Sequence, residues 1–329
     1  MLRLPDSWIW DSWYTRDDDE RHHAFFLRAS RALLDPERRH RRASIGHAVS
    51  DDLRTWDLRA DALVPSDGPA WDDLATWTGN VVRGPDQRWY LFYTGVTQSR
   101  DRAVQRIGLA ISDDLETWHR HGNRPLVEPD PAWYEDHDAS DWAGEAWRDP
   151  WVFPDPAGDG WHMLVTAHAK DAPPGSRGVV GHARSADLLH WDVGPPLTEP
   201  AGFGHLEVPQ AAVVDGQPLL LFCSNLSERD DADQLLWTVP GASVTGPWDL
   251  SLARPVPVPN LYAPRLVQDA AGSWCLLGFV ERREGRFAGE LSDPVRVRCA
   301  NGSLTPVNPV RDRLSLLETR RHDAARSLR

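Results

Sequence analysis

Runs of aromatic and β-branched residues recur along the chain, and a short stretch rich in glycine, proline or aspartate precedes them. Such runs predict β-strands, because branched and aromatic side chains fit a pleated surface, and the stretches before them predict tight turns. No helical pattern is long enough to argue for an α/β fold. The runs occupy residues 89–94, 161–166, 219–223 and 274–279, with residues 24–27 as a looser copy.

A short phrase follows these runs and repeats down the chain. It has the form Ser-x-Asp-Leu-x-x-Trp, and each copy comes after a Gly-x-Ala-x segment. The clear copies end at Trp56, Trp118 and Trp191, and a decayed copy ends at Trp248. A repeat of this length predicts an array of similar supersecondary units.

Each unit holds the signals of four short strands in the same order, which predicts an all-β fold. We expect a five-bladed β-propeller, with four-stranded antiparallel blades around a central funnel. The first unit carries an arginine-rich insertion at residues 37–42, and the fifth opens near Tyr262 and is expected to end with a strand at 295–298. The propeller is expected to occupy residues 1–310, with a tail at 311–329 packed on or beside it.

Three acidic residues fall on the strands that are expected to line the funnel. The strand that opens each blade lies innermost in a propeller, and counting back from the repeated tryptophan finds it. By that count Asp11, Asp149 and Glu207 lie at nearly the same height, each among apolar neighbours, where a lone charge is costly. A structural ion pair would explain any one of them, such as Asp149 beside Arg148. Three that converge need another explanation.

Converging carboxylates are typical of glycoside hydrolysis. One acid protonates the leaving oxygen, while another attacks the anomeric carbon or activates a water molecule. Additional negative charge favours a transition state that resembles an oxocarbenium ion. The proximity of the groups is expected to push their pKa values apart, so that one of them stays protonated near neutral pH.

Four short motifs lie in order on the predicted inner strands. Residues 10–13 read Trp-Asp-Ser-Trp, residues 77–80 read Trp-Thr-Gly-Asn, and residues 148–150 read Arg-Asp-Pro. Glu207 is followed two positions later by proline. In this order and spacing the chain resembles the clan of five-bladed propeller enzymes that act on fructosides, glycoside hydrolase families 32 and 68. His205 departs from that pattern, because levansucrases carry a second acid there.

The resemblance implies a retaining double displacement on β-fructofuranosides such as sucrose or short fructo-oligosaccharides, with water or another sugar as the acceptor. It makes Asp11 the nucleophile, Asp149 the transition-state stabiliser and Glu207 the acid/base. No metal, no cofactor and no C-terminal β-sandwich is expected. The residues expected to bind the substrate are Trp8, Trp10, Trp77, Thr78, Trp147, Arg148, His205 and Tyr262.

Two other functions stay open. The first is an inverting arabinofuranosidase or xylosidase of the related family 43 propellers, in which Asp11 would be a general base. The second is a sugar-binding propeller without turnover. The presence of all three acids argues against the second function, because a degenerate binding protein usually loses at least one of them.

Composition narrows the partners further. The net charge of −13, without a long basic block, disfavours nucleic acid and anionic membranes as partners. The 17 tryptophans suit sugar faces, although tryptophan also packs inside blades, so their number alone does not decide. No apolar stretch of about 18 residues predicts a membrane span, and no export signal precedes the motif that starts by Trp8. We therefore expect a cytoplasmic protein whose partner is a small carbohydrate.

Overall fold

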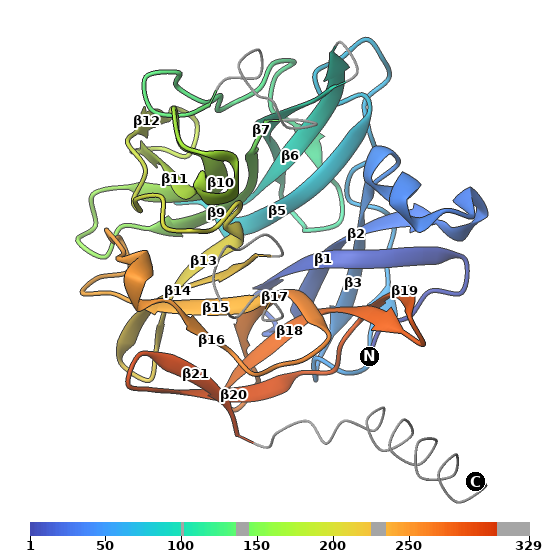
Figure 1. The fold of residues 1–329 in the computed structure, drawn as a ribbon. Helices are drawn as coiled ribbons and strands as arrows, with labels where there is room; N and C mark the ends of the chain where they lie inside the picture. The colour runs from blue at the N-terminus through green and yellow to red at the C-terminus, as the bar shows by residue number, and fades with distance from the viewer. Residues whose placement is uncertain (100–101, 136–144, 225–234, 308–329) are drawn as a thin grey trace, which may run out of the picture.

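The computed structural model describes residues 1–99, 102–135, 145–224 and 235–307, and these residues form five small antiparallel sheets arranged in a ring (Figure 1). Each sheet begins with the strand nearest the centre. The five innermost strands contact one another in a closed circuit, β1 with β5, β5 with β9, β9 with β13, β13 with β17, and β17 with β1. The prediction of a five-bladed propeller is confirmed.

The first three blades each contain four strands in chain order. They are β1 (Ser7–Arg16), β2 (His22–Ser30), β3 (Ser44–Ser50) and β4 (Asp57–Leu58); β5 (Ala75–Arg83), β6 (Trp89–Ser99), β7 (Arg102–Ser112) and β8 (His119–Arg120); and β9 (Trp147–Pro154), β10 (Trp161–His168), β11 (Gly178–Ser185) and β12 (Asp192–Gly194).

The last two blades complete the ring, and short 3₁₀ helices lie in the connections. The strands are β13 (Glu207–Val214), β14 (Gln217–Cys223), β15 (Leu236–Pro240) and β16 (Arg254–Pro255), then β17 (Leu261–Gln268), β18 (Trp274–Arg283), β19 (Arg286–Leu291), β20 (Val295–Ala300) and β21 (Ser303–Pro306). The helices are η1 (Arg31–Leu33), η2 (Pro36–Arg41), η3 (Pro174–Ser176) and η4 (Leu250–Leu252). The helices among the described residues could not reach across a lipid bilayer.

The fifth blade differs from its prediction. The strand expected to end it corresponds to β20, but β21 follows and pairs with β20 at the outer edge. Asn301 and Gly302 both have positive φ, the geometry that a two-residue hairpin turn requires, so this Asn-Gly pair was the missed signal. The expected tail at 311–329 lies outside the described residues, and the absence of a C-terminal β-sandwich stays a prediction.

The repeated phrase forms the turn between the third and fourth strands of a blade. The Asp114 carboxylate accepts hydrogen bonds from the backbone N–H groups of Glu116 and Thr117, at 2.9 and 2.7 Å. The next residue in each copy is a buried leucine with positive φ, a conformation held because the side chain fills the blade core. These leucines are Leu53, Leu115 and Leu188.

Every inner strand carries a β-bulge at the same point of its pairing with the second strand. A bulge inserts one unpaired residue and re-aims the side chains around it. Of the bulged residues, all but Thr78 have positive φ. The bulged residues are Asp11, Thr78, Asp149, Val208 and Ala263, and the residues just before them are Trp10, Trp77, Arg148, Glu207 and Tyr262.

This register adds detail to the prediction that the three acids lie at nearly the same height of the funnel. Asp11 and Asp149 are both bulged residues, whereas Glu207 is the residue before its bulge, where Arg148 stands in the third blade. Counting residues to the repeated tryptophan could not detect a shift of one position, because the turns between the strands vary in length. The acids still meet, because both positions face the axis.

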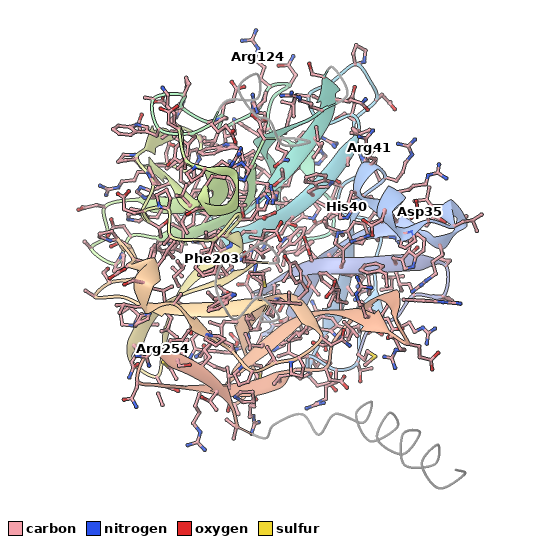
Figure 2. All side chains as sticks on the ribbon, viewed as in Figure 1. Asp35, His40, Arg41, Arg124, Phe203 and Arg254 are labelled. Atoms are coloured by element: carbon pink, nitrogen blue, oxygen red, sulfur yellow. The ribbon has the colours of Figure 1, made fainter. Side chains whose placement is uncertain are left out.

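Side chains fill the space between the blades (Figure 2). Phe203, in the link between the third and fourth blades, is fully buried and packs edge to face on Phe222 and Trp237. Contacts of this kind hold neighbouring blades at fixed angles, so the five inner strands form a rigid frame.

Candidate active site

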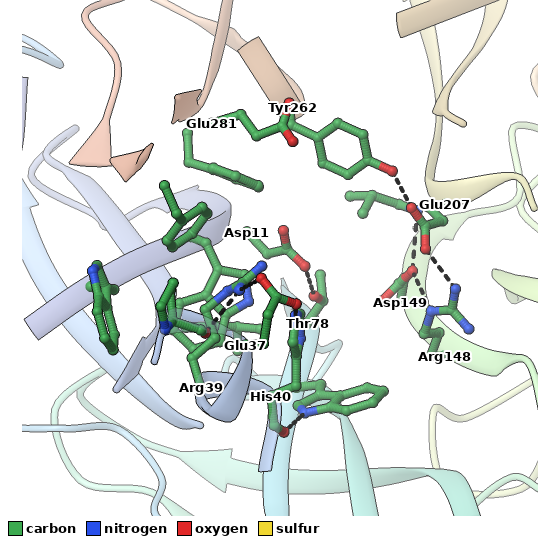
Figure 3. A pocket seen from close by; sticks show the side chains of 18 of the residues that line it. Asp11, Glu37, Arg39, His40, Thr78, Arg148, Asp149, Glu207, Tyr262 and Glu281 are labelled. Atoms are coloured by element: carbon green, nitrogen blue, oxygen red, sulfur yellow. Dashed lines mark hydrogen bonds and ion pairs between the residues drawn. The ribbon is translucent and has the colours of Figure 1, made fainter. Parts of the chain in front are cut away.

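A cavity of about 1110 Å³ opens at the centre of the ring (Figure 3). In all five blades the residue before the bulge lines it, and in four blades the bulged residue does too. The η1–η2 segment of the first blade, the hairpin between β18 and β19, Gln105 of β7, and Glu145 and His205 before β9 and β13 also line it. The fold therefore collects polar side chains from distant parts of the chain into one space.

Asp11 lies in this cavity with one close hydrogen-bond donor. The Thr78 hydroxyl donates to Asp11 Oδ2 at 2.7 Å. Burial raises the pKa of Asp11 to about 7, and the negative charges of Asp149 and Glu207 add to that effect. The positive charge of Arg39 and the bond from Thr78 oppose it. Without a ligand, Asp11 is thus half protonated near neutral pH.

Asp149 is held more tightly. Its Oδ2 lies 2.8 Å from the Thr166 hydroxyl and accepts the Val208 backbone N–H at 3.2 Å. Arg148 Nε is 3.6 Å from the same oxygen. Burial still raises the pKa of Asp149 above its usual value, although Arg148 opposes it. These bonds fix the carboxylate, since a group with several partners has one favoured orientation.

Glu207 has the opposite environment to Asp11. Arg148 Nη2 donates to Glu207 Oε1 at 2.7 Å, and the Tyr262 hydroxyl donates to Oε2 (Figure 3). Burial acts to raise the pKa of Glu207, but Arg148, His205 and the bond from Tyr262 outweigh it and hold that pKa below its usual value. Glu207 is therefore ionised in the ligand-free protein.

A chain of buried polar groups stands behind Arg148. Arg148 Nη2 is 3.4 Å from His205 Nδ1, which is 3.1 Å from His168 Nε2. His168 Nδ1 in turn lies 2.9 Å from a Glu135 carboxylate oxygen. Burial lowers the pKa of His205 to about 4 and that of His168 to about 2, so both rings are neutral at pH 7. The sequence analysis did not find His168 or Glu135, and no motif marks them.

The arginine-rich insertion, which the sequence analysis left without a role, also reaches the cavity. Its residues form η2, in which the Arg39 guanidinium lies 4.0 Å from the Phe287 ring centroid and 5.5 Å from that of Trp10. The His40 backbone oxygen accepts the Trp77 indole N–H at 2.7 Å. The insertion thus ties the first blade to the second and fifth blades at the cavity wall.

Most residues expected to bind substrate line the cavity, and one does not. Trp147 is fully buried, packs on Tyr134 and donates its indole N–H to the Val127 oxygen at 3.2 Å. It directly precedes Arg148, so strand alternation turns it to the opposite face, and the prediction of a sugar platform there is wrong. Those that line the cavity are Trp8, Trp10, Trp77, Thr78, Arg148, His205 and Tyr262.

The arrangement suits acid–base and nucleophilic chemistry by carboxylates. Two carboxyl groups in one cavity have pKa values displaced in opposite directions, which is the pattern that separates an acid from a base. Among the residues that the structure describes, no group of three or more side chains could hold a metal ion.

A five-bladed propeller with carboxylates on its inner strands defines a class of glycoside-processing proteins, and comparison with known families places the chain within it. The model of the glycosyl hydrolases family 32 N-terminal domain matches residues 8–286. The chain belongs to this family.

Curated relatives match over part of their length. The insoluble β-fructofuranosidase of Arabidopsis thaliana is 30% identical over 54% of this chain and 30% of its own length. The sucrose-6-phosphate hydrolase of Bacillus subtilis is 29% identical over 56% of this chain and 36% of its own length. The matched region therefore spans about a third of these relatives.

Solved structures share the whole fold. An inulosucrase from Halalkalicoccus jeotgali, bound to kestose, has a TM-score of 0.71 at 23% identity, covering 92% of this chain and 89% of that one. A Bombyx mori family 32 β-fructofuranosidase has a TM-score of 0.73 at 20% identity, covering 94% of this chain and 64% of that one. At these identities the likeness establishes the propeller alone.

Proposed function

We propose that the protein is a retaining glycoside hydrolase that acts on β-fructofuranosides such as sucrose or short fructo-oligosaccharides. The observation that carries the proposal is the meeting of Asp11, Asp149 and Glu207 in one cavity of a family 32 propeller. The names of its relatives, β-fructofuranosidase and sucrose-6-phosphate hydrolase, support the fructoside as the substrate class.

In the proposed reaction Asp11 attacks the anomeric carbon of the fructosyl group while Glu207 protonates the departing oxygen. Glu207 then removes a proton from water, or from the hydroxyl of another sugar, which attacks the covalent intermediate. Asp149, fixed by Thr166 and the Val208 N–H, would bond the ring hydroxyls more strongly as positive charge develops.

This chemistry requires a different proton distribution from that of the empty cavity. Asp11 must lose a proton and Glu207 must gain one, whereas burial favours the proton on Asp11 and Arg148 favours the anion at Glu207. The cavity holding one proton is the active state, and that proton titrates as a property of the pair. A sugar that draws Arg148 away from Glu207 would raise the pKa of Glu207, so that the proton moves from Asp11 to Glu207, which can then donate it to the leaving oxygen.

The test is product chromatography after incubation with sucrose, a sucrose phosphate, short fructans and aryl furanosides. Asp11→Asn and Glu207→Gln should each lower kcat/KM by at least about 10⁴-fold on the preferred substrate. Arg184→Met serves as a control, because Arg184 is an exposed arginine paired with Asp155 outside the cavity. Full activity of Asp11→Asn would remove the retaining mechanism.

The inverting alternative of the family 43 type differs in the stereochemistry of its product. NMR of the first anomer released from each furanoside distinguishes retention from inversion, and addition of an acceptor sugar reveals transfer. A protein that binds sugars in calorimetry but releases no product from any substrate would be the non-catalytic propeller.

A further inference from the structure

Arg265 is a buried arginine for which the proposed reaction has no role. It lies on β17 two residues after the bulge and is 1% exposed. Its Nη1 donates to the backbone oxygens of Val208 and Pro209 at 3.1 and 2.7 Å, and its guanidinium lies 5.0 Å from the Trp151 ring centroid. The fifth blade thereby holds the bulge of the fourth.

The bulge that Arg265 holds touches two of the three acids. Val208 directly follows Glu207, and the Val208 N–H donates to Asp149 Oδ2 at 3.2 Å. A shift of this backbone would move both carboxylates. Arg265 therefore acts on Glu207 and Asp149 through Val208, which it contacts directly.

Equivalent positions in other blades perform the same bracing without charge. Asn80 Oδ1 accepts the Val152 N–H of the next blade at 2.9 Å. Gln210 bonds both the N–H and the carbonyl of Leu266, at 2.7 and 3.0 Å. A neutral amide therefore suffices to brace neighbouring blades, whereas a buried charge is costly unless it is compensated.

Arg265 forms no ion pair with any of the described residues. Its Nε and Nη2 have no hydrogen-bond partner there. Burial lowers the pKa of Arg265 to about 10, and the negative charges of Asp149 and Asp11 act against that effect, so it is a cation at neutral pH. Inside the cavity, Arg148 contacts two of the three carboxylates directly, those of Asp149 and Glu207.

We propose that Arg265 is a positioning residue whose bonds fix the 207–209 backbone and whose positive charge, behind the cavity wall, favours the ionised forms of Asp11 and Asp149. The proposal rests on the proposed function for its kinetic consequences. The charge effect itself does not depend on turnover.

Other charged or titratable groups lie close to Arg265 and to Asp11. The Cys223 thiol of β14 is the other titratable neighbour of Arg265, and burial raises its pKa, so it is neutral. The groups that act most strongly on Asp11 are Asp149 from β9, Glu207 from β13, Arg39 from η2 and Thr78 from β5, and Arg265 from β17 acts on it in addition.

Two variants separate the charge from the bracing. Arg265→Gln keeps a hydrogen-bond donor and removes the charge, while Arg265→Lys keeps the charge on a shorter side chain that does not reach the place of Nη1 between the two carbonyls. In Arg265→Gln the upper limb of the pH profile of kcat/KM should move upward by roughly one pH unit, because the carboxyl pair holds its proton longer. In Arg265→Lys that limb should stay in place while kcat falls about tenfold. Arg254→Met, which removes an exposed arginine bonded to the Asn301 oxygen, is the control.

A second measurement needs no activity. The difference in unfolding free energy between a protein and its Asp11→Asn derivative changes with pH between the pKa of Asp11 in the unfolded chain and its pKa in the folded protein. The pH at which the slope of this change has fallen to half its maximum on the alkaline side is the midpoint of the titration of Asp11 in the folded protein. Placing Arg265→Gln in both members of the pair should move the midpoint upward by the same unit, and Arg265→Lys should leave it unchanged. A midpoint unmoved by Arg265→Gln, or moved equally by both variants, contradicts the proposal.

The outcomes remain distinct from those of the proposed function. A wild-type protein inactive on every fructoside, with the midpoint still moved by Arg265→Gln, would reject the function and keep the charge effect. If Arg265→Gln does not fold, Arg265→Lys decides, because a moved midpoint in a variant that keeps the charge overturns the proposal.

Discussion

The two sides of the cavity treat their carboxyl groups in opposite ways. On the first-blade side, Asp11 has the Thr78 hydroxyl as its close partner, and its pKa is raised to about 7. On the fourth-blade side, Glu207 bonds Arg148 and Tyr262, and its pKa is lowered. Burial raises the pKa of both carboxyl groups, so the difference between them comes from the neighbouring charges and hydrogen bonds.

This contrast teaches where the site stores free energy. Asp11 is a buried acid that favours protonation, so ionising it at high pH destabilises the folded state. Glu207 is stabilised by its ion pair, and the proposed chemistry must disrupt that pair to protonate it. The site is therefore destabilised at Asp11 when that group is ionised and stabilised at Glu207 by the ion pair with Arg148, as expected where function opposes stability.

The largest effect that tests this contrast is a stability change of opposite sign in two neutral variants. The raised pKa of Asp11 gives stability that is present at low pH and lost as pH rises through about 7. Asp11→Asn should therefore gain on the order of 4 kcal/mol in unfolding free energy at pH 8 and nothing at pH 4. The depressed pKa of Glu207 works the other way, so Glu207→Gln should lose roughly 3 kcal/mol at pH 8 by removing the carboxylate that pairs with Arg148 Nη2.

Urea denaturation at a series of pH values measures both changes. The matched control is Asp67→Asn, an exposed aspartate for which the pH dependence should stay that of the wild type. Changes of the same sign in Asp11→Asn and Glu207→Gln would mean that the two sides of the cavity do not differ.

Removal of the arginine itself should make the two sides more alike. In Arg148→Met, Glu207 loses its closest charge partner, so its pKa should rise toward that of Asp11. We expect kcat/KM to fall about 10²- to 10³-fold and the lower limb of its pH profile to move upward. If kcat/KM falls equally in Arg148→Lys but the lower limb of its pH profile does not move, the loss of activity is due to geometry and the shift of the limb in Arg148→Met is due to charge.

The repeat made the architecture and much of the site predictable. A turn phrase that recurs in the first three blades, with a decayed copy in the fourth, indicates the order of strands, and strand order places Asp11 and Asp149 at the axis. The bulges were not predictable, because they depend on how the second strand pairs with the first. They explain how Glu207 can face the axis one position before the bulge, whereas Trp147 faces the core because it alternates with Arg148 along the strand.

Other parts of the site carry no local signal at all. Arg39 reaches the cavity only because η2 docks against Phe287, which is distant in the chain. His168 and Glu135 meet behind Arg148 through contacts between a strand and the segment before β9. Such pairings follow from tertiary packing, which a single sequence without a repeated motif does not reveal.

The pH profile of the wild type gives a smaller but direct measure of the contrast. One shared proton is required, so activity should be lost when both groups are protonated and when neither is. Since the pKa of Asp11 is about 7, kcat/KM should fall about tenfold per pH unit above that value and be greatest on its acidic side. A profile that keeps rising above pH 8 would show that no proton in this range is needed.

The smallest expected effect belongs to Tyr262. Tyr262→Phe removes one neutral hydrogen bond to Glu207 but leaves Arg148 in place, and the phenyl ring can keep the packing on Phe279. Because a neutral donor stabilises an anion less than a cation does, the lower limb should move upward by less than in Arg148→Met, with kcat/KM reduced about three- to tenfold. Equal shifts in the two variants would mean that burial and the hydrogen bond, rather than the ion pair, set the state of Glu207. The order of the two shifts therefore decides whether Arg148 or Tyr262 does more to keep Glu207 ionised.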